Sequence, residues 1–103
     1  MEERKAVYNL DCRYDSRKSF YGKARVEETK DDTGVVMRLY SYGTLVASYI
    51  EYSEIGSKVF DWLGTWSQTT TRHQREFFKQ LGLGEGDIKK LKEKGRLVYE
   101  REN

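Results

Sequence analysis

Hydrophobic and polar residues alternate along the first two-thirds of the chain, which is the period of a β-strand. Ala24 and Val26 point to one side of the chain, whereas Lys23 and Arg25 point to the other. This pattern predicts a strand at 20–28 with one buried and one solvated face. Further strands are predicted at 35–41, 45–52 and 57–63, and the segments 6–12 and 96–100 are candidates for additional strands, the latter as a last edge strand.

The period of the hydrophobic positions changes to that of a helix after the strand at 57–63. The Ser and Thr residues within 67–71 are suitable N-caps, and the helix that they begin is predicted to end at Gly82. A second, shorter helix is predicted at 86–94, with Gly95 as its stop. The chain therefore predicts an α+β fold, in which an antiparallel meander of three to five strands carries two C-terminal helices on one face.

The composition indicates a single domain that spans residues 1–103. Only 37% of the residues are hydrophobic and 35% are charged, a balance close to the one at which chains fail to collapse. Eight Tyr, four Phe and two Trp offset this balance, because each aromatic ring buries a large apolar area. The sequence therefore predicts a folded domain with a thin core.

Charge and targeting signals are weak. The net charge of +2 is too small to indicate nucleic-acid binding. No stretch approaches the roughly 20 apolar residues that a membrane span needs, and the N-terminal segment has no apolar signal region. The only cysteine, Cys12, has no partner for an internal disulfide. We therefore expect a cytoplasmic protein without membrane attachment.

Side chains suited to catalysis or metal binding are few. A zinc site takes about four Cys or His ligands, whereas the chain has one of each, Cys12 and His73. The sequence also has no Gly-rich phosphate loop and no calcium-binding spacing. We therefore expect no catalytic residues, no metal and no cofactor. The remaining enzyme hypothesis is a small nuclease that depends on His73, although a helical histidine more often packs at the edge of the core.

Two segments combine cations with aromatic rings, and both are predicted to bind a partner. In the first, residues 14–26, the predicted strand places Tyr and cations together on its outer face. Such a surface suits single-stranded nucleic acid and protein hot spots equally well. The residues expected to make contacts there are Arg17, Lys18, Tyr21, Lys23 and Arg25. The alternative is that the rings cover the core and the cations only solvate the sheet.

The second segment is the first predicted helix, within residues 69–83. Arg72, Arg75 and Lys79 lie on one stripe of it, and the threonines before them are suitable for binding a phosphate at the helix N-terminus. The alternative is a solvated stripe in which Glu76 pairs with Arg72 or Lys79.

Tyrosines lie on both faces of the middle strands. Tyr40 and Tyr42 fall on one face of their strand, and Tyr49 and Tyr52 fall on opposite faces of the next. Because helices can cover only one face of the sheet, some of these rings are expected to be exposed, at a partner site or in a homodimer. Tyr40 and Tyr42 therefore join the predicted binding residues.

Three blocks, YDSRKSFYGKARV, LYSYGTLVA and WSQTTTRHQREFFKQLGL, resemble a family of small proteins of unknown function from phages, plasmids and conjugative elements of Gram-positive bacteria. The resemblance extends over residues 14–83, with 66–82 as its most specific part, and leaves out the tail at 84–103. It implies a mobile-element context, in which small proteins often act on nucleic acid or on the host machinery that handles it. It carries no catalytic role to any residue.

We therefore expect a non-enzymatic binding protein, monomeric or homodimeric, that acts on a host protein or nucleoprotein complex in the bacterial cytoplasm. Inhibition of a host-defence complex such as a CRISPR effector is one such role. Direct binding of RNA or single-stranded DNA is the first alternative. A nuclease that depends on His73 and a purely structural homo-oligomer are the others.

Overall fold

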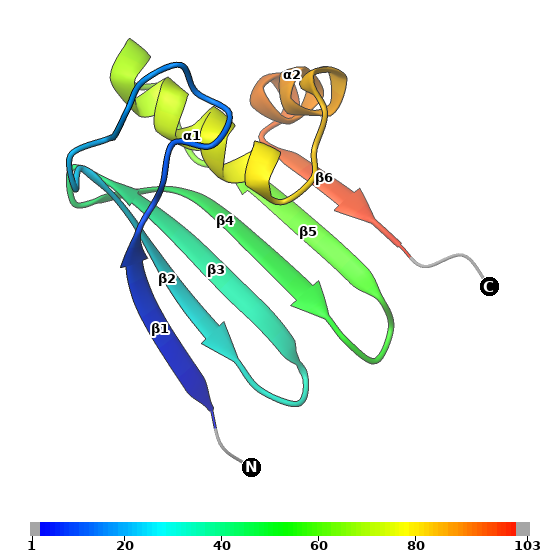
Figure 1. The fold of residues 1–103 in the computed structure, drawn as a ribbon. Coiled ribbons are helices and arrows are strands. Elements are labelled where there is room, and N and C mark those ends of the chain that lie inside the picture. Colours follow the sequence, from blue (N-terminus) through cyan, green and yellow to red (C-terminus); the bar gives the residue numbers. More distant parts are fainter. Residues whose placement is uncertain (1–2, 101–103) are drawn as a thin grey trace.

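The computed structural model describes residues 3–100, which form one six-stranded antiparallel sheet and two helices (Figure 1). The strands are β1 (Arg4–Asn9), β2 (Ala24–Lys30), β3 (Gly34–Ser41), β4 (Thr44–Tyr52), β5 (Ser57–Trp62) and β6 (Arg96–Tyr99). The helices α1 (Gln68–Gln80) and α2 (Glu85–Lys94) lie between β5 and β6 in the chain. The strand order in the sheet is the order in the sequence, so that each strand pairs with the one before it.

The predicted α+β class and the meander with two C-terminal helices are confirmed, but the sheet has six strands rather than three to five. The two edge strands account for the difference. All residues of β1 are exposed, and β6 has only four residues. Neither strand carries the strong alternation of hydrophobic positions on which prediction of a strand depends.

The strand predicted at 20–28 begins later, at Ala24. Tyr21 and Gly22 both have positive φ, a conformation outside the range of strand residues. The chain therefore turns at these two residues. As a result, Tyr21 does not share a strand face with Arg25, as the alternation had suggested.

Both helices end at the predicted glycines. Ser67 caps α1, where its hydroxyl oxygen accepts a hydrogen bond from the Thr70 N–H at 3.2 Å. Gly82 follows α1 with a φ of 94°, and Gly95 follows α2 in the left-handed conformation. No helix in residues 3–100 is long and apolar enough to cross a membrane.

The core lies between the helices and one face of the sheet (Figure 1). The ring of Phe78 on α1 stacks on Trp62, with centroids 5.9 Å apart, and meets Phe60 edge-on at 6.2 Å. Aromatic rings thus supply much of the buried area in a domain with few aliphatic residues. Other buried hydrophobic residues of this core are Ala24, Val26, Leu39, Ala47, Tyr49, Phe77, Ile88 and Leu91.

No helix of residues 3–100 covers the other face of the sheet (Figure 1), which we call the open face. The strand register aligns its side chains in rows across the sheet. One row, from β3 to β6, is apolar: Val36, Ile50, Val59 and Val98. The next row is polar: Arg38, Ser48, Asp61 and Arg96. Arg96 and Asp61 pair at 2.7 Å and so join β6 to β5.

Candidate functional site at the paired tyrosine turns

Two turns with the sequence Tyr-Gly lie next to each other at one end of the sheet. Tyr21 and Gly22 precede β2, and Tyr42 and Gly43 connect β3 to β4 as a two-residue hairpin loop. All four residues have positive φ, between 50° and 84°. The backbone N–H of Tyr42 donates a hydrogen bond to the carbonyl oxygen of Lys23 at 2.8 Å. The two turns are therefore held side by side, and we call them the paired turns.

The left-handed conformation is unusual for tyrosine. It brings the Cβ of an L-residue close to its own carbonyl oxygen and costs about 1–2 kcal/mol. Two-residue hairpin loops of this kind therefore favour Asn-Gly or Asp-Gly. The Tyr21 side chain is 79% exposed and that of Tyr42 is 58% exposed. Burial in the core therefore offsets little of the strain at either position.

A buried polar cluster lies beneath the paired turns. Nδ1 of His73 is 2.8 Å from the hydroxyl oxygen of Ser41, which is itself 2.9 Å from that of Thr70. The imidazole packs edge-on against Phe20 with centroids 4.5 Å apart, and the Tyr42 ring lies 5.9 Å away. These contacts connect α1 to both turns, and all of the side chains involved except Tyr42 are shielded from water.

His73 is only 1% exposed, deeper than the core-edge position predicted for it. Burial lowers the pKa of His73, and the negative charge of Asp15 opposes this shift only in part. The ring is therefore neutral at neutral pH. The geometry suits a role in positioning the paired turns.

The only thiol of the chain, Cys12, is half-buried and packs against the core. Burial is the main cause of its raised pKa, and the carboxylate of Asp15 adds to it. Thiolates are the reactive form of cysteine, so this environment makes the thiol less reactive. Within residues 3–100, no cluster of three His, Cys, Asp or Glu side chains could hold a metal ion.

Most of the predicted contact residues lie around the paired turns. Arg17 and Lys18 are exposed in the loop 10–23 that leads to Tyr21, and Lys23 follows Gly22. Residues 3–100 provide no ion-pair partner for any of these three cations.

Arg25 and Tyr40 extend this region onto the open face. They are directly paired across β2 and β3, and the guanidinium carbon of Arg25 lies 4.8 Å from the centroid of the Tyr40 ring. A hydrogen bond with Glu27 is the main cause of the raised pKa of Tyr40. The phenol is therefore protonated at neutral pH and the cation lies over a neutral ring.

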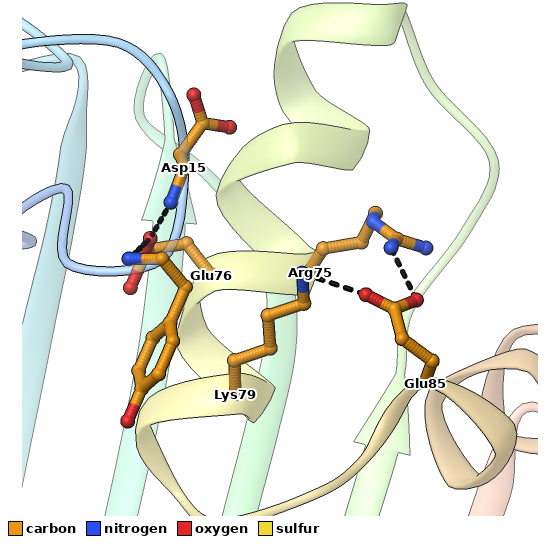
Figure 2. A network of polar contacts seen from close by, with 6 residues as sticks. Asp15, Arg75, Glu76, Lys79 and Glu85 are labelled. Atoms are coloured by element: carbon orange, nitrogen blue, oxygen red, sulfur yellow. Dashed lines mark hydrogen bonds and ion pairs between the residues drawn. The ribbon is translucent and has the colours of Figure 1, made fainter.

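The three cations predicted on the first helix lie elsewhere, and each has an intramolecular partner. Figure 2 shows Arg75 and Lys79 converging from α1 on the carboxylate of Glu85 at the start of α2. Hydrogen bonds from Lys79 and then Arg75 lower the pKa of Glu85. Arg72 pairs with Asp15 of the loop 10–23 at 3.5 Å.

The pairing of Glu76 with Arg72 or Lys79, considered from the sequence, is wrong. Glu76 is 1% exposed and faces the loop 10–23. One of its oxygens accepts hydrogen bonds from the backbone N–H groups of Tyr14 and Asp15, both at 2.8 Å (Figure 2). These partners lie more than 60 residues earlier in the chain, so no local sequence signal could have identified them.

A known protein family matches most of the chain. The family described as Family of unknown function (DUF8033) matches residues 8–95. The match continues past residue 83 through α2, whereas the resemblance recognised in the sequence left the tail from residue 84 outside. No curated protein and no solved structure matches the chain. The chain belongs to the DUF8033 family of unknown function.

Proposed function

We propose that this protein acts by binding a partner, and that the paired turns are the centre of its contact surface. The observation that carries the proposal is the pair Tyr21 and Tyr42, two tyrosines in a strained conformation with exposed rings. Backbone strain is concentrated at sites where a function depends on it. An exposed tyrosine offers a large, rigid surface that loses little conformational entropy on binding, which suits a hot spot.

The cations beside the paired turns support a partner with acidic groups around an apolar centre. Arg17, Lys18 and Lys23 are exposed, and such charges guide association and orient the partner. The partner we propose is a protein of a host complex that handles nucleic acid. The resemblance to proteins of phages and other mobile elements supports this choice. Inhibition of a host-defence complex, such as a CRISPR effector, is the corresponding biological role.

Direct binding of RNA or single-stranded DNA at the paired turns is the competing interpretation, because bases stack on tyrosine and phosphates pair with cations. The two interpretations differ in their dependence on salt. Binding to phosphates releases counterions, so the affinity for an oligonucleotide falls steeply as the salt concentration rises.

Affinity capture from a bacterial lysate tests the proposal. The bait is the full chain, and the test variant is the double substitution Tyr21→Asn and Tyr42→Asn, which removes both rings and keeps residues that tolerate positive φ. Tyr52→Asn removes an exposed tyrosine at the far end of β4 and is the matched control.

The expected result is a protein captured by the wild type and by Tyr52→Asn, also after nuclease treatment, and lost by the double variant. Equal capture by all three baits would refute the role of the paired turns. Capture that nuclease treatment abolishes would favour direct binding of nucleic acid. Thermal unfolding of each bait verifies that the variants are folded.

A further inference from the structure

A depression with a volume of about 470 Å³ lies between α1 and α2, apart from the paired turns. Its lining combines an exposed aromatic ring, polar side chains and cations. The residues that matter here are Trp66, Gln68, Thr71, Arg72, Arg75 and Lys92. The volume falls within the range of sites that take small ligands.

Positive charge dominates the depression. Arg72, Arg75 and Lys92 line it, whereas Asp15, which pairs with Arg72 at 3.5 Å, is the one acidic residue among its lining side chains. Arg75 shares the carboxylate of Glu85 with a second cation, so this ion pair leaves positive charge uncompensated. In residues 3–100, Lys92 has no ion-pair partner. The depression therefore favours an anion.

The start of α1 adds to this preference. Gln68 and Thr71, in the first turn of the helix, line the depression. The first turn contains no acidic residue, although acidic residues there would be stabilising. The positive end of the helix dipole is thus not neutralised from within the helix, and it acts together with the three cations on a bound anion.

Trp66 provides a fixed aromatic surface at the same place. Its indole is 48% exposed, and its Nε1–H donates a hydrogen bond to the carbonyl oxygen of Leu63 at 2.8 Å. Gly64 packs directly against the ring, because a Cβ at that position would lie 2.7 Å from Nε1. The ring is therefore held in place while part of its surface remains open to a planar ligand.

We infer that this depression binds a nucleotide, with the base against Trp66 and the phosphate against Arg72, Arg75 and Lys92. An aromatic ring next to a cluster of cations matches the two chemical parts of a nucleotide. The nucleotide is either free in solution or one unit of a single strand, and both sources present the same base and phosphate. The site includes neither of the strained tyrosines and stands independently of the proposed function.

Tryptophan fluorescence measures this binding directly. The chain has two tryptophans, and only Trp66 is exposed, because Trp62 lies in the core. The full chain is titrated with adenosine monophosphate, with a short oligoadenylate and with inorganic phosphate, at low and at physiological salt. We expect saturable quenching by the two adenine ligands, and weaker affinity at the higher salt concentration.

Variants then locate the site. Arg72→Gln and Lys92→Gln are each expected to lower the affinity by about tenfold, as for the loss of one charge-assisted contact. Trp66→Phe is expected to abolish the quenching. Lys90→Gln is the matched control for Lys92→Gln, because Lys90 is an exposed lysine of α2 that does not line the depression. This variant should bind nucleotide like the wild type.

The pattern of affinities distinguishes the sources. If the oligoadenylate binds more tightly than the mononucleotide, the site is supported and its ligand is a single strand. If the two affinities are equal, the site is supported and its ligand is a free nucleotide. Inorganic phosphate that binds as tightly as the mononucleotide would overturn the assignment of the base to Trp66. Absence of saturable binding, or equal loss in Lys90→Gln and Lys92→Gln, would overturn the site itself.

Discussion

The carboxylate of Glu76 lies 2.8 Å from the backbone nitrogen of Tyr14, and this contact fastens the loop 10–23 to α1 (Figure 2). The same oxygen accepts the N–H of Asp15, and the other oxygen accepts a hydrogen bond from the side chain of Gln80 at 2.7 Å. A buried carboxylate with three donors is well compensated for its loss of water. Because the loop leads directly to Tyr21, Glu76 connects the core to the paired turns.

Replacement of Glu76 by alanine is expected to lower the free energy of unfolding by about 3 kcal/mol, since two backbone N–H groups lose a charged acceptor. Glu93→Ala, at an exposed position of α2, is the matched control and should change stability by less than about 0.5 kcal/mol. Urea denaturation of the wild type and of the two variants measures both changes in stability. Equal stabilities of the two variants would show that the Glu76 contacts contribute nothing.

Substitution of Tyr21 by asparagine is expected to stabilise the protein by about 1 kcal/mol, because asparagine tolerates positive φ better than tyrosine does. The Tyr21 ring is largely exposed, so little burial is lost. Tyr42→Asn should gain less, since the Tyr42 ring lies against His73. Thermal unfolding compares the variants, and a lower melting temperature for Tyr21→Asn would contradict the assignment of strain at this turn.

Stability is expected to fall on the acidic side because of His73, the only histidine of the chain. Burial lowers its pKa below the ordinary value of 6.5. Below that pH the unfolded chain binds a proton that the folded chain still excludes, so the free energy of unfolding decreases as the pH falls from 6.5 towards the folded pKa.

The measurement for His73 is urea denaturation as a function of pH, with His73→Gln as the comparison. Subtracting the variant from the wild type removes the contribution of the carboxylates that the two proteins share. The difference between their stabilities should shrink as the pH falls through this window. A difference that does not depend on pH would mean that His73 titrates alike in the folded and unfolded states.

Gly34→Ala is expected to destabilise the protein by about 3 kcal/mol, through strain and steric overlap. Gly34 has a φ of 154°, and a Cβ there would lie only 1.8 Å from the carbonyl oxygen of Glu51 on β4. Gly86→Ala is the matched control, because Gly86 lies in α2 with open space around it.

Alanine at position 86 should stabilise the helix by about 0.5–1 kcal/mol. Chemical denaturation of both variants is expected to give shifts of opposite sign. Similar stabilities for the two variants would exclude the close approach of β3 to β4 as the reason for glycine at position 34.

Local patterns in the sequence were sufficient for most of the elements. Ala24 and Val26 alternate with cations because the side chains of a strand point to opposite faces, and the structure buries both. Gly82 and Gly95 end the helices because the left-handed conformation that follows a helix favours glycine. These signals depend only on residues that are neighbours in the chain, so they can be recognised in the sequence without the tertiary structure.

The turn at Tyr21 was not predicted, because the local pattern there is that of a strand. Alternating residues continue from β2 back to Phe20, and tyrosine is a common strand residue, so nothing local indicated positive φ. A hydrogen bond from the Lys23 N–H to the carbonyl oxygen of Phe20 closes this turn. The hydrogen bond from Tyr42 to Lys23 and the packing of Phe20 on His73 hold the turn in place, and both of these contacts join segments that are distant in the sequence.

The sequence by itself determined the class of the fold, the limits of its helices and the exposure of some of its tyrosine rings. Only the tertiary structure decided which face of the sheet the helices cover, that Glu76 holds the loop 10–23, and that Tyr21 and Tyr42 lie side by side. The physical reason is one of range. Periodicity and capping act over a few residues, whereas these contacts form only when the folded chain brings distant segments together.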